Sequence, residues 1–167
     1  SHIKDEAVLR CQNSYYCPAQ QKASIKHFVS KNCLDIDGFG EKLVEQLINE
    51  NVLSNLSDIF YLEFNDLILL DRMAEKSVNN ILNAIKKSKK TDLWRFINGL
   101  GIKNIGQNPS KILAQNFKDI KKLYNLSIDD LLEINEIGDI MSNSIIDFFN
   151  NQNNINIINR CLKSGLE

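Results

Sequence analysis

The chain has 167 residues, 43% of them hydrophobic, which is enough to bury one core and a small appendage. Seven glycines and only two prolines suit helices better than a β-sandwich or barrel. The sequence contains no run of about 18 apolar residues and no signal-peptide pattern, which excludes a membrane-spanning segment and predicts a cytoplasmic location.

The net charge of −1 is low for a DNA-binding protein, but the charges are unevenly distributed. Residues 1–122 carry 18 Lys and Arg against 14 Asp and Glu. Residues 123–159 carry six acidic residues and neither Lys nor Arg. We therefore expect nucleic acid to contact the part of the chain that precedes this acidic segment.

A cysteine pair lies near the start of the chain, where five residues separate Cys11 from Cys17. Structural zinc needs four Cys or His ligands, usually supplied as two close pairs. His27 and Cys33 could complete such a set, but the helical pattern around His27 places its side chain toward solvent. We therefore expect at most half a zinc site at Cys11 and Cys17, and we expect Cys33 and Cys161 to be ordinary buried or half-buried thiols.

A pattern with a spacing of 32 to 34 residues organises the rest of the chain. Its anchor positions are Gly40, Ala74, Gly106 and Gly138. The residues one and four positions before the anchors are apolar, namely Phe39, Met73, Ile105 and Ile137, and Ile36, Leu70, Ile102 and Ile134. Seven positions after the anchors come Leu47, Ile81, Leu113 and Ile145. This spacing predicts the buried face of a helix, and one repeat cannot bury its apolar face alone. We predict four tandem units of helix, tight hairpin and helix.

The chemistry of the first hairpin, Asp37-Gly38-Phe39-Gly40, suits phosphate. Two glycines permit a sharp turn and a close approach. The second glycine leads into a helix, whose free N–H groups and dipole attract anions. Lys42 and Lys76, each two residues past an anchor, add positive charge. The alternative interpretation is that the glycines only permit the turn and the lysines are solvated.

The third hairpin is the best candidate for a DNA contact. Lys103, Asn104 and Gly106 present a cation, an amide and a glycine together, and Lys111 follows about one turn later. The alternative is that Asn104 is only a turn former that tolerates positive φ. In the fourth hairpin Glu136 replaces the first glycine and would repel a phosphate. In the second, Ala74 replaces the anchor glycine, which costs little if φ is negative there.

Further helices are predicted between and after the hairpins. They are a short helix opened by Ser57-Asp58, another opened by Asn65-Asp66, a helix from Glu75 to about Lys89, and a last short helix over residues 157–162 after an asparagine-rich connector over residues 150–156. Thr91 is expected to cap the helix that follows the lysine cluster Lys86-Lys87-Ser88-Lys89-Lys90. Trp94 in that helix is expected to pack into the core rather than stack on a base.

Several short motifs occur in an order that is typical of one protein family. They are Cys11 to Cys17, Ala19-Gln20-Gln21-Lys22, Lys26-His27-Phe28-Val29-Ser30, Asp35-Ile36-Asp37-Gly38-Phe39-Gly40, Asp71-Arg72-Met73-Ala74-Glu75-Lys76-Ser77 and Leu100-Gly101-Ile102-Lys103-Asn104-Ile105-Gly106. With these motifs the chain resembles the zinc finger and helix-hairpin-helix region of bacterial NAD-dependent DNA ligases, from about Val8 to its C-terminus.

The resemblance implies a role and a set of cofactors. In that family a Cys-x-x-Cys pair upstream shares one zinc ion with the pair that matches Cys11 and Cys17. That upstream pair is absent here, so the resemblance implies a truncated zinc finger with half a site, and it implies that His27 is not a ligand. The family's helix-hairpin-helix domain holds nicked DNA in replication and repair while an adenylation domain uses NAD and Mg to seal the break. Neither NAD nor Mg is expected to bind this chain, which has no adenylation motif and no other catalytic constellation. The chain alone is expected to be inactive.

We therefore predict an all-α fold, with a partial zinc-finger segment at residues 1–23 and a helix-hairpin-helix DNA-binding domain at residues 24–167. Its predicted function is to bind duplex DNA without reading sequence, beside the other domains of a ligase. The residues expected to bind DNA are Gly38, Gly40, Lys42, Arg72, Lys76, Lys103, Asn104, Gly106 and Lys111. Two alternatives stay open, a helix-hairpin-helix scaffold of another DNA repair or recombination protein and a helical protein-interaction domain.

Overall fold

The computed structural model describes residues 18–70 and 73–166, and these ranges contain no strand. The elements are α2 (Pro18–Val29), α3 (Glu41–Asn49), the 3₁₀ helix η1 (Leu56–Tyr61), α4 (Phe64–Ile68), α5 (Glu75–Ser88), α6 (Leu93–Gly99), α7 (Gln107–Phe117), the 3₁₀ helix η2 (Ile120–Leu123), α8 (Ile128–Leu132), α9 (Asp139–Asn150) and α10 (Gln152–Lys163). The all-helical fold predicted from the sequence is confirmed. None of the helices in the described ranges is long and apolar enough to cross a membrane.

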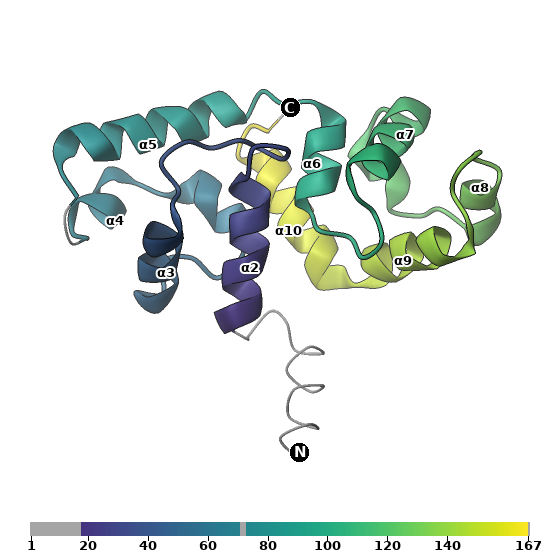
Figure 1. The fold of residues 1–167 in the computed structure, drawn as a ribbon, viewed down its shortest axis with the longest axis horizontal. Helices are drawn as coiled ribbons and strands as arrows, with labels where there is room; N and C mark the ends of the chain where they lie inside the picture. The colour runs from purple at the N-terminus through teal and green to yellow at the C-terminus, as the bar shows by residue number, and fades with distance from the viewer. Residues whose placement is uncertain (1–17, 71–72, 167) are drawn as a thin grey trace, which may run out of the picture.

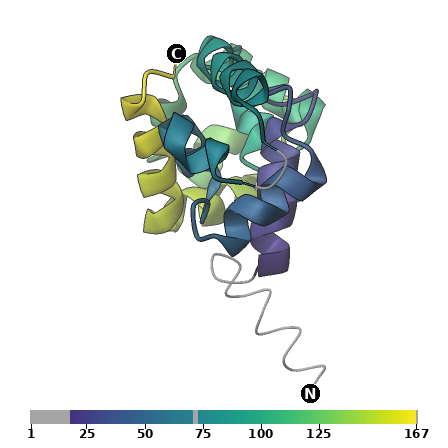
Figure 2. The same ribbon diagram turned by 90° about the vertical axis from the view of Figure 1, so that its left-hand side faces the viewer.

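The helices form an elongated molecule (Figure 1). Helices α3, α4 and α5 lie at one end, α7, α8 and α9 lie at the other, and α2, α6 and α10 lie between them. After a 90° turn, α10 appears on the side opposite α3 (Figure 2). The same order of elements occurs twice. Residues 18–88 form two helices, a 3₁₀ helix, a five-residue helix and a further helix, and residues 93–150 form the same series. We call these ranges the N-terminal half and the C-terminal half.

The repeated apolar positions form the core of both halves. The residues seven positions after the anchors are all buried, with exposed fractions of 0% for Leu47, 5% for Ile81, 0% for Leu113 and 0% for Ile145. All four belong to one hydrophobic cluster. Burial of an aliphatic side chain of this size contributes about 1.5–3 kcal/mol. The face that the sequence pattern assigned to the core is therefore the buried face.

The two halves meet where α2 contacts α6. The ring of Phe28 packs edge to face against Phe96, with ring centroids 6.2 Å apart. The Nδ2 of buried Asn98 donates a hydrogen bond to the Asn32 carbonyl at 3.1 Å. The carbonyl oxygen of Asn98 lies 2.7 Å from Nε2 of His27. These contacts join α2 and the loop that follows it to α6 of the C-terminal half.

Helix α2 begins earlier than the pattern around His27 indicates. Its first residue is Pro18, and a proline suits this position because the first helical N–H has no partner within the helix. The predicted domain boundary between residues 23 and 24 therefore falls inside α2.

The predicted capping residues are wrong by one or two positions. Asn55, not Ser57, precedes η1, and its side chain accepts a hydrogen bond from the Ser57 N–H at 2.9 Å. Asp58 accepts in return from the Asn55 N–H at 3.1 Å, which completes a capping box. In the same way, Glu63 precedes α4 in place of Asn65, and Asp92 precedes α6 in place of Thr91. Several polar residues adjoin each of these starts, so composition alone does not select the capping residue.

The asparagine-rich stretch is helical, and its assignment as a connector is wrong. Helix α10 begins at Gln152, five residues earlier than expected, because the side chain of Asn151 caps it by accepting from the Asn153 N–H at 2.9 Å. Helix α10 then buries Ile158 and Cys161. Asparagine is a weak helix former, but a cap and a buried face offset that preference.

Candidate nucleic-acid interface

Each of the four anchor residues directly precedes a helix. Gly40, Ala74, Gly106 and Gly138 are the N-cap residues of α3, α5, α7 and α9, with extended backbones and φ values of −77°, −99°, −95° and −96°. None of the four accepts a side-chain capping hydrogen bond from its helix. The N–H groups of the first turn are therefore left without a side-chain cap at four helix ends, and such ends attract anions.

The anchor glycines are not explained by the fold of the chain. All three have negative φ, a conformation that any residue adopts. A Cβ added at Gly40, Gly106 or Gly138 would meet no atom within 4 Å. Ala74 occupies the equivalent position in the second hairpin with a negative φ, the condition under which replacement of glycine costs little. The fold could therefore accommodate a side chain at each anchor. Because glycine has none, the surface above the helix N-terminus stays open.

The position two residues before each anchor has a different requirement. Gly38, Asn104 and Glu136 all lie in the left-handed region, with φ values of 94°, 66° and 77°. A Cβ at Gly38 would also lie 2.9 Å from Cγ1 of Ile81. Glycine at residue 38 is thus required by the turn and its packing, which accounts for this predicted site residue without DNA.

Asn104 combines the turn with a contact between units. Its Nδ2 donates a hydrogen bond to Oγ of Ser144 on α9 at 3.0 Å. The third hairpin therefore lies against α9 in the C-terminal half, much as Gly38 of the first hairpin lies against Ile81 of α5 in the N-terminal half. Gly38 and Met73 also line one surface hollow, which brings the first and second hairpins together. In each half, one hairpin thus contacts the helix that follows the other anchor of that half.

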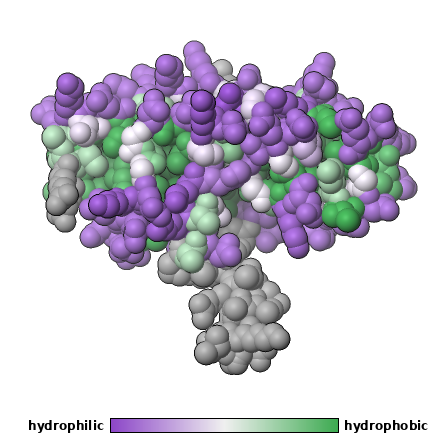
Figure 3. Space-filling model, in the orientation of Figure 1, coloured by the Kyte–Doolittle hydropathy of each residue, from purple (hydrophilic) through white to green (hydrophobic). Residues whose placement is uncertain are grey.

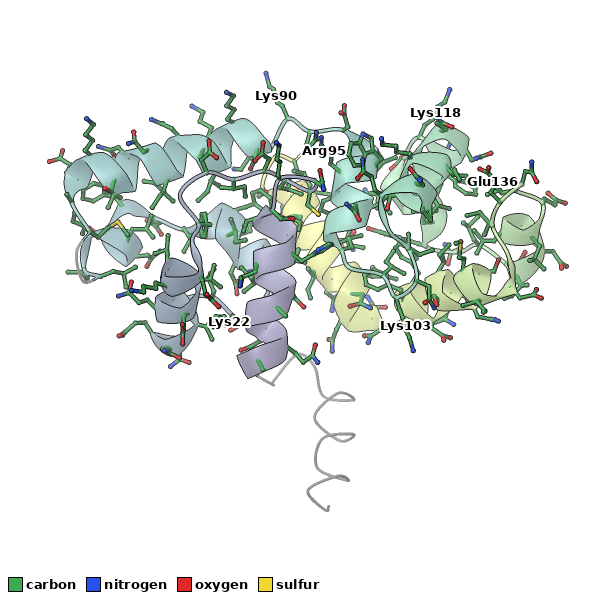
Figure 4. All side chains as sticks on the ribbon, in the orientation of Figure 1. Lys22, Lys90, Arg95, Lys103, Lys118 and Glu136 are labelled. Carbon is green, nitrogen blue, oxygen red and sulfur yellow. The ribbon has the colours of Figure 1, made fainter. Side chains whose placement is uncertain are left out.

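Most of the predicted lysines project into solvent. Lys42, Lys76 and Lys103 are exposed, and the described residues provide none of them with an ion pair. Figure 4 shows Lys103 on the lower edge of the molecule, Lys90 and Lys118 on the upper edge, and Arg95 beside α6. Arg72, also predicted to bind DNA, lies outside the described residues.

Lys111 has a specific intramolecular partner. Its Nζ lies 4.7 Å from the centre of the Trp94 ring, and the guanidinium carbon of Arg95 lies 4.8 Å from the same ring. Trp94 is half-buried and does not belong to the hydrophobic core cluster, so the prediction that it packs into the core is not confirmed, and its ring instead attracts two cations. The ring positions Lys111 and Arg95 beside the start of α6, a cationic feature that the spacing of residues did not indicate.

The residue directly after each anchor was missed by sequence reasoning. It is Glu41, Glu75, Gln107 and Asp139 in the four units, so only the third has a neutral residue at the helix start. The Glu41 carboxylate lies 3.2 Å from Nζ of Lys22 and 3.3 Å from Nζ of Lys26. The hydrogen bond with Lys22 is the main reason why the pKa of Glu41 is lowered. Two lysines of α2 thus neutralise an acid beside the first hairpin. A comparison of the residues that follow the four anchors would have shown that only the third is neutral.

The predicted zinc ligands Cys11 and Cys17 lie outside the described residues. Within residues 18–70 and 73–166, no three His, Cys, Asp or Glu side chains come together in a way that could hold a metal ion. Cys33 and Cys161 are both fully buried free thiols, as predicted. Nε2 of His27 is 3.6 Å from Sγ of Cys33 and is already hydrogen-bonded to the Asn98 carbonyl. The hydrogen bond with Cys33, and then the one with Asn98, raise the pKa of His27.

Known proteins with similar sequences agree with the hairpin geometry described above. Residues 95–158 match the helix-hairpin-helix motif family, and this range contains the third and fourth hairpins. The prediction of two further units before it remains a prediction. The chain is 44% identical over 164 residues, or 98% of its length, to a DNA ligase of Clostridioides difficile (strain 630). It spans about a quarter of that protein, covering 24% of its length. These two findings confirm the resemblance carried by the motifs: over nearly its whole length, this chain matches one segment of a bacterial DNA ligase.

Proposed function

We propose that this chain is the segment of an NAD-dependent DNA ligase that grips duplex DNA, and that it holds nicked DNA for sealing in replication and repair. The supporting observation is the open surface at the anchor glycines. Gly40 and Gly106 have ordinary backbone angles and free space where a Cβ would lie, so the fold does not need them. A phosphate oxygen that approaches the first-turn N–H groups does need that space.

The pairing of hairpins suggests how a duplex would be held. Two hairpins side by side can contact the two phosphate backbones that border one minor groove. Backbone N–H groups and lysines recognise phosphates and not base edges, so binding would be independent of sequence. The third hairpin combines Lys103, neutral Gln107 and the free anchor Gly106, and we assign it the strongest contact.

The remaining steps of ligation would depend on parts of the ligase other than this segment. NAD, as the source of the adenylate for the 5′ phosphate, and Mg²⁺ would both bind elsewhere in the ligase. Cys11 and Cys17 would supply half of a zinc site. The contribution of this segment is to position the duplex beside the adenylation domain, in the cytoplasm of a bacterium. We expect no sealing activity from this chain alone.

The test is fluorescence anisotropy of a labelled nicked duplex at low and moderate salt, with the double variant Gly40→Asp and Gly106→Asp. Both sites accept a side chain, and aspartate at an N-cap stabilises a helix, so folding is expected to persist. The two carboxylates occupy the proposed phosphate positions and should weaken binding at least about tenfold at low salt. Gly38 is unsuitable for this test, because its positive φ and its contact with Ile81 would make a substitution unfold the hairpin.

A matched control adds the same charge elsewhere. Asn156→Asp with Asn159→Asp places two new carboxylates on α10, where both side chains already accept hydrogen bonds through Oδ1. We expect this variant to bind the duplex nearly as well as the unchanged chain. Equal losses in both double variants would mean that net charge governs binding, and the proposed phosphate sites would be wrong.

A further inference from the structure

The C-terminal half carries a surface groove that the proposed DNA contacts leave unused. It has a volume of about 760 Å³ and lies between the end of α7 and the fourth hairpin. Its apolar lining is provided by half-buried side chains, including Ile112 and Phe117 on one side and Leu126 and Ile134 on the other. These side chains pack against the core yet stay partly open to solvent. The groove therefore offers an apolar floor of the kind that anchors a side chain of another protein.

The rim of the groove is acidic. Asp130, Glu133 and Glu136 line it, and Lys122 is its one cationic lining residue among the described residues. Asp130 is occupied, because it accepts hydrogen bonds as the capping partner of Ser127. Glu133 and Glu136 are exposed, and no ion pair within the described residues involves either carboxylate. Two carboxylates of the rim are thus available to an external cation.

The fourth hairpin holds Glu136 in an uncommon backbone conformation. Glu136 has a φ of 77°, a left-handed conformation in which the other described hairpins carry glycine or asparagine. A glutamate in this conformation costs about 1 kcal/mol or more relative to glycine. The carboxylate of Glu136 therefore lines the groove from a turn position that glycine would adopt more easily.

The fourth unit also differs from the first two in its exposed apolar residues. Ile140, two residues past the fourth anchor, is 71% exposed, and Leu132 on α8 is 41% exposed. The equivalent of Ile140 is Lys42 in the first unit and Lys76 in the second. Hydrophobic residues reach the surface over α8 and α9 at this end of the molecule (Figure 3). Apolar side chains among carboxylates suit a protein partner and not a phosphate backbone.

We propose that this groove binds a basic segment of a partner protein, which places an apolar side chain on the floor and Lys or Arg side chains against Glu133 and Glu136. Charge complementarity selects this occupant, because three acids, Asp130, Glu133 and Glu136, line the groove against one lysine, Lys122. The proposal does not depend on DNA binding by the other hairpins.

The test uses a short labelled peptide that combines arginine and leucine residues, and a matched peptide with glutamate in place of every arginine. We expect the basic peptide to bind this chain in anisotropy titrations and the acidic peptide not to bind. In nuclear magnetic resonance spectra of the ¹⁵N-labelled chain, the shifted amides should cluster in residues 112–117 and 126–136. Shifts centred on the first three hairpins, or equal binding of the two peptides, would overturn the proposal.

Isosteric variants locate the interaction. Glu133→Gln with Glu136→Gln should weaken binding of the basic peptide about fivefold, while duplex DNA binding should not fall. Asp147→Asn removes an exposed acid of α9 that does not line the groove, and it should leave peptide binding unchanged. An unchanged affinity in the Gln variant would overturn the proposal. A dimer in sedimentation experiments that the Gln variant dissociates would also overturn it, because the occupant would then be a second copy of this chain.

Discussion

The third and fourth hairpins share one backbone and differ in nearly all of their surface. Both anchors, Gly106 and Gly138, have nearly the same φ and the same empty space beside them. The third hairpin carries Lys103 and no acid from residue 101 to residue 108, whereas the fourth carries three acids and no base from residue 133 to residue 140. The repeated fold thus preserves its core while the surface of each unit changes, and similarity of fold alone does not assign a ligand to every unit.

The largest expected effect tests whether the third and fourth units bury their repeated apolar positions equally well. Leu113→Ala in α7 and Ile145→Ala in α9 each remove a fully buried side chain at the same repeat position. Each should lower the free energy of unfolding by about 3 kcal/mol, measured by urea denaturation. A loss below about 1 kcal/mol at one site only would show that the two units are not packed alike.

Exchanging charges should make the fourth hairpin resemble the third. Glu136→Asn with Asp139→Gln introduces the residues found at the equivalent positions 104 and 107. Because two carboxylates are removed beside a helix N-terminus, affinity for duplex DNA at low salt should rise by about three- to tenfold. Asp129→Asn with Asp147→Asn removes two acids outside the hairpin and serves as the control. Equal gains in both double variants would show that the effect is one of net charge.

A smaller effect concerns backbone strain. Glu136→Gly should raise the free energy of unfolding by about 0.5–1 kcal/mol, because glycine adopts the φ of 77° more easily than glutamate does. Asn104→Gly should bring no gain, since asparagine tolerates this conformation and its hydrogen bond to Ser144 would be lost. Thermal or urea unfolding of the two variants provides the comparison. A destabilised Glu136→Gly variant would contradict the assignment of strain.

The smallest expected effect is a pH dependence at the contact between the halves. The pKa of His27 is raised in the folded chain, so its contribution to stability is complete below the ordinary pKa and is lost as pH rises through the raised value. Relative to His27→Gln, the unchanged chain should therefore gain more stability at about pH 5.5 than at about pH 8.5. Urea unfolding at both pH values measures this difference. The opposite order would mean that burial, which lowers the pKa, outweighs the hydrogen bonds.

Much of the fold could be predicted because its repeat is periodic. The anchors, the buried residues seven positions later and the helix from Glu75 all follow from spacing, and α5 ends at Ser88, one residue from its expected end. The start of α10 could not be predicted in this way, because asparagine has similar local preferences in a cap and in a loop. Only the packing of Ile158 and Cys161 decides between the two.

The candidate site was predicted less completely, for physical reasons. Sequence spacing identified the anchors, but it could not distinguish Gly38, which the turn needs, from Gly40, which the fold does not need. Contacts between distant residues also decide the local charge. Lys22 and Lys26 neutralise Glu41 across 19 and 15 positions of sequence, and Trp94 holds Lys111 from another helix. Such pairs depend on tertiary structure and leave no periodic signal.

The central claim is that phosphate binds at the anchor of the third hairpin and not at that of the fourth. The most direct measurement compares Gly106→Asp with Gly138→Asp in anisotropy titrations of nicked duplex over a range of salt concentrations. We expect Gly106→Asp to weaken binding about tenfold at low salt and to reduce its salt dependence, with little change in Gly138→Asp. Equal losses in the two variants, or a loss confined to Gly138→Asp, would contradict this account.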